Sequence, residues 1–212
     1  PLFPARKVEV SASCAQGKAW RPKTDSSSSV ASKRRSSETS VRFASSGGVL
    51  NPLGIKIGPT YNLDDIKQLV QILNPANEPG RITLITRLGV KNVEKALPPL
   101  LRGMKQEGFN IVWSCDPMHA NTYTTEDGHK TRNFNDILSE ITCFFETHWS
   151  EGTIPGGVHF ELTGENVTEC TGGARNIVDD QLFENYQTTC DPRLNAEQSL
   201  EVAFQIADMI RS

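Results

Sequence analysis

The sequence predicts an α/β fold of four consecutive βα units that follows a leader without predicted structure. From Asn51 onward, apolar runs of strand length alternate with amphipathic stretches of helix length, as in proteins built on a parallel sheet. The first three runs begin about 30 residues apart, and a unit of a (β/α)8 barrel has about that length. Residues 49–212 are therefore predicted to form one domain, either half of a (β/α)8 barrel or a small open doubly wound sheet. These patterns alone do not choose between the two.

The leader, residues 1–48, has a different composition. It is rich in serine, contains the basic run Lys33-Arg34-Arg35 and shows no apolar periodicity. Such a segment cannot bury enough apolar surface to offset the entropy lost on ordering, so we predict that it is disordered. Basic, serine-rich and acid-poor leaders are typical of organelle transit peptides, but a linker or a tail unrelated to function would have the same composition.

The four predicted strands are short and apolar. Their residues do not alternate cleanly between polar and apolar types, which favours strands that are buried on both faces, as in a parallel sheet. The predicted strands cover residues 53–57, 82–86, 110–114 and 158–162.

Four amphipathic helices are predicted between and after these strands. The first begins after Asn62, a favourable N-cap residue. The second covers residues 93–107 and is expected to kink or restart at Pro98-Pro99. The third begins near Asn135, and the last runs from about Asn195 to the end of the chain. The residues expected to face the sheet are Ile66, Leu69, Val70 and Leu73 in the first helix, Ile137, Ile141, Phe144, Phe145 and His148 in the third, and Leu200, Ala203, Phe204 and Ala207 in the last.

Composition and charge argue against several classes of function. The net charge is −3, so a binding surface for nucleic acid is not expected. No apolar run approaches the roughly 20 residues of a membrane helix, so no membrane partner is expected either. The five cysteines are irregularly spaced and include no CxxC pair, which favours a reducing compartment over a disulfide scaffold. We therefore expect a cytoplasmic protein, or a plastid protein if the leader is a transit peptide.

Each predicted strand has an ionisable residue at or after its carboxyl end. In chain order these residues are Lys56, Arg87, His119 and Glu161. In (β/α)8 barrels the carboxyl ends of the strands meet at one face, where the active site lies. One such residue could be a capping or snorkelling side chain, but four are harder to explain in this way, because buried charges are costly unless they are paired or bound. Two cations beside two types of metal ligand predict an anionic substrate held next to a metal ion.

The ligand types narrow the choice of metal. His159 and Glu161 are two residues apart, so both side chains point to the same face of the strand, toward the barrel axis. A set of nitrogen and oxygen ligands suits Mn, Fe, Co or Zn better than Ca. Cys115 and His119 could instead form a zinc pair, but the sequence has no second Cys/His pair to complete a structural site.

Six sequence blocks, taken together, resemble class II 3-deoxy-D-arabino-heptulosonate 7-phosphate (DAHP) synthases. The resemblance implies a (β/α)8 barrel that condenses phosphoenolpyruvate with erythrose 4-phosphate to give DAHP and phosphate, the first step toward chorismate and the aromatic amino acids. It also implies a divalent metal, most commonly Mn²⁺, and a homo-oligomer for the intact enzyme. The blocks lie in the family's order between about Asn51 and Ile210 and read NPLGIKIGP, PGRITLITRLG, WSCDPMHANT, GHKTRNF, PGGVHFELTGENVTECTGG and CDPRLNAEQSLEVAF.

By position in these blocks, the resemblance assigns roles to single residues. Asp116 is expected to shape the turn before His119, and Cys115 is expected to be a packed thiol. The metal ligands of the family fall on His119, Glu161 and Asp191, the cations that bind phosphoenolpyruvate fall on Lys56 and Arg87, and an active-site, catalytic lysine falls on Lys130.

Part of the family's pattern has no counterpart in the sequence. The family's fourth metal ligand is a cysteine on the first strand, and the residues that bind the phosphate of erythrose 4-phosphate also lie in the first half of the barrel. Residues 1–48 contain nothing similar to those blocks, and the context of Cys14 makes it a poor substitute. We therefore expect the C-terminal half of the barrel behind an unrelated leader, inactive by itself. The alternative is a non-catalytic half-barrel fragment that only associates with a partner.

Overall fold

The computed structural model describes residues 9–12 and 51–211. Strands and helices alternate along most of this length, so the predicted α/β class is confirmed. In chain order the elements are β1 (Glu9–Ala12), β2 (Leu53–Ile57), α1 (Leu63–Leu73), β3 (Ile82–Thr86), α2 (Val93–Gln106), β4 (Ile111–Cys115), β5 (Thr122–Thr124), β6 (Lys130–Arg132), α3 (Phe134–Ser150), β7 (Gly157–Phe160), the 3₁₀ helix η1 (Asp179–Asn185) and α4 (Ala196–Arg211).

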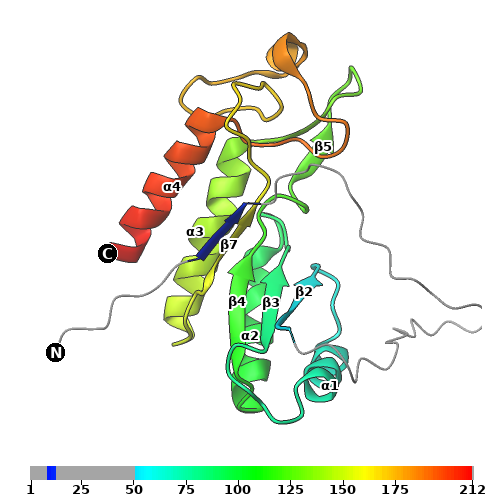
Figure 1. The fold of residues 1–212 in the computed structure, drawn as a ribbon, viewed down its shortest axis with the longest axis vertical. Coiled ribbons are helices and arrows are strands. Elements are labelled where there is room, and N and C mark those ends of the chain that lie inside the picture. Colours follow the sequence, from blue (N-terminus) through cyan, green and yellow to red (C-terminus); the bar gives the residue numbers. More distant parts are fainter. Residues whose placement is uncertain (1–8, 13–50, 212) are drawn as a thin grey trace, which may run out of the picture. The chain divides into compact units, whose positions relative to one another are not determined.

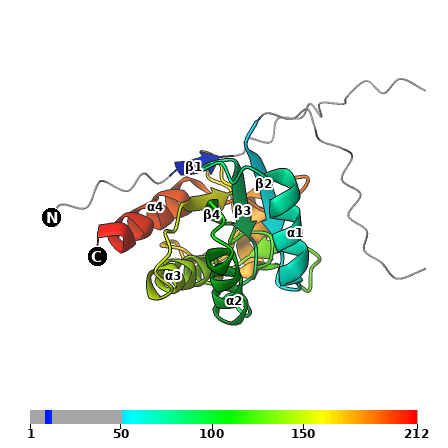
Figure 2. The ribbon, with the colours of Figure 1, turned by 90° about the horizontal axis from the view of Figure 1, so that it is seen from below.

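Five strands form one parallel sheet in the order β1-β7-β4-β3-β2 (Figure 1). From β2 to β7, each strand of this sheet lies beside the one before it along the chain, and the order does not reverse. Right-handed crossovers between such strands place their helices on one side of the sheet, and Figure 2 shows α1 to α4 along the same side. Because a doubly wound sheet has a reversal of strand order and helices on both faces, the structure does not support that alternative.

The two faces of the sheet differ in burial. Leu84 in β3 and Trp113 in β4 lie opposite each other in the register, and both are buried in the core with the helices. On the other face, Lys56 in β2 and Val112 in β4 are exposed. The prediction that the strands are buried on both faces is therefore wrong for β2 and β4, because the described helices cover one side only.

Strand β1 lies within the segment that was predicted to be disordered. Its four residues pair in parallel with β7, Glu9 opposite Gly157 and Ala12 opposite Phe160. The prediction of disorder is therefore wrong for residues 9–12, where backbone pairing to a sheet edge replaces the missing apolar periodicity. The rest of the predicted leader, including Cys14, lies outside the described residues.

Two of the predicted helices form as the local pattern indicates. The side chain of Asn62 caps α1 by accepting hydrogen bonds from the backbone N–H groups of Asp64 and Asp65. The apolar stripe predicted for α3 is buried along its whole length, from Ile137 to His148.

Helix α2 differs from its prediction because it continues through Pro98-Pro99 without a break. Each proline lacks the N–H group that would bond to the carbonyl four residues earlier, which weakens the middle of the helix. Burial of Leu97, Leu100 and Leu101 against the sheet side offsets this loss. Packing therefore decides the outcome that the two prolines left open.

Helix α4 shows the opposite face to the core from the one that was predicted. Leu200 is 61% exposed and Phe204 is 68% exposed, while Val202 and Ile206 are buried. Both sets repeat at helical spacing, so periodicity could not tell which set contacts the protein. The prediction that Leu200, Ala203, Phe204 and Ala207 face inward is wrong for the first three, which are exposed, while Ala207 is half-buried.

The hairpin of β5 and β6 was not predicted from the sequence. Its strands are three residues long and antiparallel, and they are joined by a turn that includes Gly128 at φ 84°. Since Lys130 and Arg132 are two residues apart on β6, their side chains share one face of the hairpin.

The burial of α4 leads to a prediction on stability. Ile206→Ala should lower the free energy of unfolding by about 2–4 kcal/mol, because it removes buried methyl groups and leaves a cavity. Leu200→Ala, at an exposed position of the same helix, should change it by less than about 0.5 kcal/mol. Urea denaturation of both variants measures the difference, and a larger loss for Leu200→Ala would show that the faces are assigned wrongly.

His148 leads to a second prediction, on pH. It is fully buried between Trp113 and Phe144, and burial lowers its pKa to about 4. As the pH falls, this histidine is protonated at a higher pH in the unfolded chain than in the folded one. The stabilising contribution of neutral His148 is therefore fully present above about pH 6.5 and is lost as the pH drops toward 4. From pH 6.5 to 5 the wild type should lose about 1–2 kcal/mol more than His148→Phe, which cannot titrate. Equal losses in urea denaturation at the two pH values would contradict this assignment.

Candidate metal and anion site

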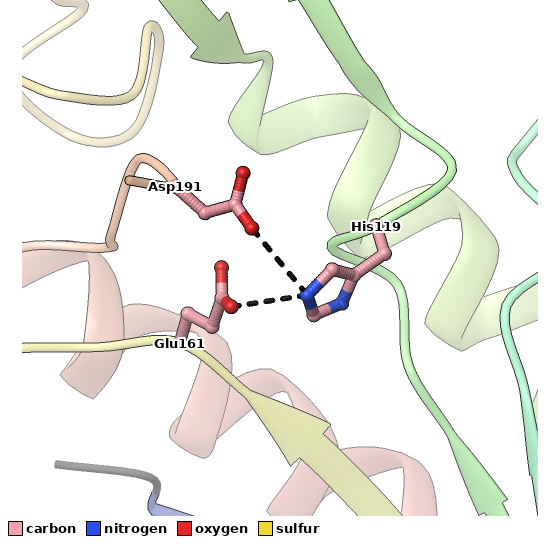
Figure 3. A group of neighbouring side chains, drawn as sticks. All are labelled: His119, Glu161 and Asp191. Atoms are coloured by element: carbon pink, nitrogen blue, oxygen red, sulfur yellow. Dashed lines mark ion pairs between the residues drawn. The ribbon is translucent and has the colours of Figure 1, made fainter. Parts of the chain in front are cut away.

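Among the described residues, one group of His, Cys, Asp and Glu side chains is close enough to share a metal ion. It consists of His119, Glu161 and Asp191, whose candidate ligand atoms all lie within 4.8 Å of one another (Figure 3). The Nε2 atom of His119 is 3.0 Å from a carboxylate oxygen of Glu161 and 3.8 Å from one of Asp191. The predicted convergence of these three side chains is confirmed.

The three residues come from loops at the carboxyl edge of the sheet. His119 lies in the turn after β4, and Glu161 directly follows β7. Asp191 lies between η1 and α4. The parallel register brings the ends of β4 and β7 together, with Cys115 opposite Val158. Sheet geometry therefore delivers His119 and Glu161, while a loop delivers Asp191.

A buried carboxylate orients the imidazole of His119. Asp116 is fully buried, and one of its carboxylate oxygens is 2.7 Å from the Nδ1 atom of His119. Its other contacts are the backbone N–H groups of Met118 and His119 and the ammonium group of Lys56, 2.7 Å away. Burial alone would raise the pKa of Asp116, but the hydrogen bonds from Lys56 and His119 outweigh burial and lower it. Asp116 thus shapes the turn, as predicted, and also holds the ring.

This orientation determines what the site can bind. Because Asp116 contacts Nδ1, the Nε2 atom of His119 is the ring nitrogen left to face a ligand. Nε2 faces carboxylate oxygens of Glu161 and Asp191, so one imidazole nitrogen and two carboxylates converge on one place. One imidazole nitrogen and two carboxylates suit a transition metal such as Mn, Fe, Co or Zn. The residues present therefore fit a divalent metal ion.

Two cations lie beside the His119 turn. Lys56 is on the sheet face that points away from the helices, and its Nζ atom is 3.4 Å from Nδ1 of His119. Arg87 directly follows β3 and donates a hydrogen bond to the carbonyl oxygen of His119, at 3.2 Å. The Nε atom of Arg87 has no hydrogen-bond partner among the described residues, so an anionic oxygen could satisfy it. Both predicted cations are thus next to the candidate metal site.

The β5–β6 hairpin adds two more cations, which contact the carboxylates of the group. Lys130 forms an ion pair with Asp191, whose pKa is lowered first of all by this hydrogen bond. Arg132 is fully buried; it donates to Glu161 at 2.6 Å and to the carbonyl oxygen of Pro192. Each carboxylate of the group therefore has its own basic partner, which orients it toward His119.

Arg132 and Glu169 were not predicted from the sequence. Glu169 is fully buried and accepts hydrogen bonds from the guanidinium and the backbone N–H of Arg193, which fixes the loop that carries Asp191. The two-residue spacing of Lys130 and Arg132 was a usable signal for Arg132. No local signal marks Glu169, because its partner is 24 residues away.

Two residues considered as ligands are not part of the group. Cys115 lies on the sheet face that packs on the helices, and burial raises its pKa well above the ordinary value, so it stays a protonated thiol. This agrees with the expectation of a packed thiol and argues against a zinc pair with His119. His159 lies on the same side of β7 as Glu161, but it is not one of the three converging residues.

A sequence model of the class-II DAHP synthetase family matches residues 32–207. The chain belongs to this family. The resemblance seen in the six sequence blocks is therefore confirmed, and the match begins inside the segment that was predicted to be an unrelated leader. The predicted boundary near residue 48 thus does not coincide with the start of the family match.

Two bacterial relatives show how much of a longer family member this chain matches. It is 50% identical to phospho-2-dehydro-3-deoxyheptonate aldolase AroG of Mycolicibacterium smegmatis over 163 residues, which are 77% of this chain and 35% of the relative. It is 48% identical to phospho-2-dehydro-3-deoxyheptonate aldolase of Streptomyces coelicolor over 171 residues, which are 81% of this chain and 38% of the relative. The matched part is thus little more than a third of each relative.

The predictions on membranes and location have different outcomes. No helix within the described residues has the length and apolar character needed to cross a membrane. The plastid alternative gains no support from the two bacterial relatives. The cytoplasmic location stays a prediction.

The geometry leads to a prediction on metal binding. Asp191→Asn replaces one of the two carboxylate ligands by a neutral amide and should weaken Mn²⁺ binding at least about 10-fold. Even changes to residues that only support the ligands commonly lower metal affinity by that factor. Cys115→Ala should leave the affinity unchanged, because this thiol faces the helices. Electron paramagnetic resonance titration of free Mn²⁺ measures both. A loss in Cys115→Ala with none in Asp191→Asn would favour the Cys115/His119 pair instead.

Proposed function

We propose that this chain provides the metal-binding and phosphoenolpyruvate-binding part of a DAHP synthase, which joins phosphoenolpyruvate to erythrose 4-phosphate and releases phosphate. The observation that carries the proposal is that three metal-ligand side chains and two cations lie together at one sheet edge, in a chain that belongs to the class-II family. The name of the two relatives, phospho-2-dehydro-3-deoxyheptonate aldolase, agrees with this reaction.

We further propose that the sheet is the C-terminal half of a (β/α)8 barrel. The strand order without reversal and the single layer of helices support this arrangement. The exposed side chains of Lys56 and Val112 would then face the barrel interior. A first half of the barrel would cover that face and bring the residues for erythrose 4-phosphate.

Each residue of the site has a role in this proposal. His119, Glu161 and Asp191 would hold the metal, which when bound would supply Lewis-acid polarisation of the aldehyde carbonyl of erythrose 4-phosphate. Mn²⁺ is our first choice, with Co²⁺, Fe²⁺ and Zn²⁺ as alternatives. Asp116 would keep Nε2 of His119 free for the metal by accepting a hydrogen bond from Nδ1–H.

The cations would bind and orient phosphoenolpyruvate. Lys56 and Arg87 would neutralise its phosphate and carboxylate groups and direct its C3 carbon to the aldehyde carbon. Water would then add at C2, and phosphate would leave. Lys130, held by Asp191, is placed to stabilise negative charge on the aldehyde oxygen, which makes it our candidate catalytic residue.

The charge of the site supports an anionic substrate. Four basic and three acidic side chains surround His119, so a divalent metal would leave the site with a clear positive charge. Phosphoenolpyruvate carries a carboxylate and a phosphate, together about −2.5 to −3 at neutral pH. The two charges are nearly complementary, which favours this substrate over a neutral one.

The test is an assay for DAHP with Mn²⁺, phosphoenolpyruvate and erythrose 4-phosphate. The chain alone should be inactive, because substrate positioning to within about an ångström needs both halves of the site. The chain mixed with the first half of the M. smegmatis relative should show activity. No activity in the mixture, although the halves associate, would favour the alternative of a non-catalytic fragment.

The same mixture tests the role of Arg87. Arg87→Ala should raise the Michaelis constant for phosphoenolpyruvate about 30-fold or more, which corresponds to about 2 kcal/mol for a lost charge partner. Arg102→Ala is the matched control, because Arg102 is exposed on α2 and pairs with Glu151 away from the site. An unchanged Michaelis constant in Arg87→Ala would reject the assignment. The homo-oligomer expected for the intact enzyme stays a prediction.

A further inference from the structure

Glu140 is a buried carboxylate for which the proposed reaction has no direct use. It lies on α3, is fully buried and forms no ion pair among the described residues. One of its oxygens accepts hydrogen bonds from the backbone N–H groups of Leu88 and Gly89, at 3.0 and 2.9 Å. The other oxygen accepts a hydrogen bond from the side-chain amide of Asn121, at 2.7 Å. Burial raises the pKa of Glu140 to about 7, although the three hydrogen bonds act to lower it. A carboxylate at this position therefore has an energetic cost.

Asn121 extends the same network to a second loop. Its side-chain oxygen accepts the backbone N–H of Val90 at 2.9 Å, and its amide also donates to the carbonyl oxygen of Pro117 at 2.8 Å. Pro117 and Asn121 lie on either side of His119 in the loop after β4. Residues 88–90 directly follow Arg87 in the loop after β3. Glu140 and Asn121 therefore join the loop of the anion-binding arginine to the loop of the metal ligand.

The two loops also touch each other directly. A Cβ atom on Gly89 would come within 3.1 Å of the carbonyl oxygen and 3.2 Å of the Cβ atom of Ala120, and Gly89 has φ 80°. Close backbone contact of this kind leaves little freedom for one loop to move without the other. The network thus fixes a contact that is already tight.

The hydrogen-bond pattern demands a carboxylate at position 140. Both oxygens of Glu140 act as acceptors, since their three partners are all N–H donors. A glutamine there would offer one acceptor and one donor, and its amide would face the amide of Asn121. Rotating the side-chain amide group of Asn121 by half a turn would remove that conflict, but its NH₂ group would then face the N–H of Val90, another donor. A glutamine at position 140 therefore leaves a donor unsatisfied as long as position 121 is an asparagine.

An exchange of the two functional groups would remove this conflict. With a glutamine at position 140 and an aspartate at position 121, the side-chain amide of the glutamine would donate to the carboxylate of the aspartate, the reverse of the present direction. The glutamine oxygen would still accept from Leu88 and Gly89, and the aspartate would still accept from Val90. The carbonyl oxygen of Pro117 would lose its donor, so the exchanged pair should restore most of the network but not all of it.

We propose that Glu140 and Asn121 form a positioning pair that fixes Arg87 relative to His119, so that the phosphoenolpyruvate site and the metal site keep one common geometry. The inference rests on the proposed function of Arg87 and His119. Neither residue of the pair touches the metal ligands through its side chain; both act through the backbone of the two loops. Loss of the pair should therefore weaken phosphoenolpyruvate and metal binding together, without removing a ligand.

The experiment compares four forms of the chain: the wild type, Glu140→Gln, Asn121→Asp and the double variant. Binding of Mn²⁺ is titrated first, and phosphoenolpyruvate is then titrated calorimetrically at saturating Mn²⁺. Each single variant should bind phosphoenolpyruvate at least about 10-fold more weakly, as is common when groups behind a site are changed. The double variant should recover most of this loss, because the exchanged pair satisfies the N–H donors of both loops. Recovery distinguishes a positioning pair from general damage to the fold.

Controls separate the outcomes. Glu146→Gln removes an exposed carboxylate from the same helix and should leave both affinities unchanged. A wild type that binds neither Mn²⁺ nor phosphoenolpyruvate would overturn the proposed function itself. A wild type that binds both, with a folded Glu140→Gln variant of equal affinity, would overturn the positioning pair. If the single variants do not fold, the double variant decides: binding within about 3-fold of wild type supports the pair, and a folded double variant that binds at least about 10-fold more weakly overturns it.

Discussion

The parallel register of β2, β3, β4 and β7 is the constraint on which the site depends. Because consecutive strands lie side by side without a reversal, their carboxyl ends share one edge, and all their helices share one side. Lys56, Arg87 and Glu161 then reach one region although they are up to about 100 residues apart in the sequence. A slip of one residue in β2 would turn Lys56 toward the helices, since side chains alternate between the faces.

Buried charge is the second feature that organises this edge. Asp116, Arg132, Glu140 and Glu169 are all fully buried. Each would be costly alone, and each has polar partners of a different kind: Lys56 and His119 for Asp116, Glu161 for Arg132, backbone and amide donors for Glu140, and Arg193 for Glu169. These contacts reach across loops that follow different strands. These polar contacts therefore help to fix the loops, together with buried apolar side chains such as Leu88 and Met118.

The two faces of the sheet differ in their contacts. The helix-facing side of the sheet has a continuous apolar core, while the opposite side exposes Lys56 and Val112. The metal ligands and the cations lie at the rim of that exposed face. The matched part is 35% and 38% of the two relatives. The exposed Leu200 and Phe204 on α4 mark a second surface with apolar side chains outside the core.

The sequence by itself determined the features that depend on neighbouring residues. Strands β2 and β3, the Asn62 cap and the buried stripe of α3 all follow from local patterns, and strand ends pointed to Lys56, Arg87, His119 and Glu161. Asp191 was found only through the family resemblance, because it lies in a loop and not at a strand end. Tertiary structure alone decided the inward face of α4, the β5–β6 hairpin and the partners of Asp116, Arg132 and Glu140. The physical reason is that each of these depends on contacts between segments distant in the chain, whose energies no local pattern of residues encodes.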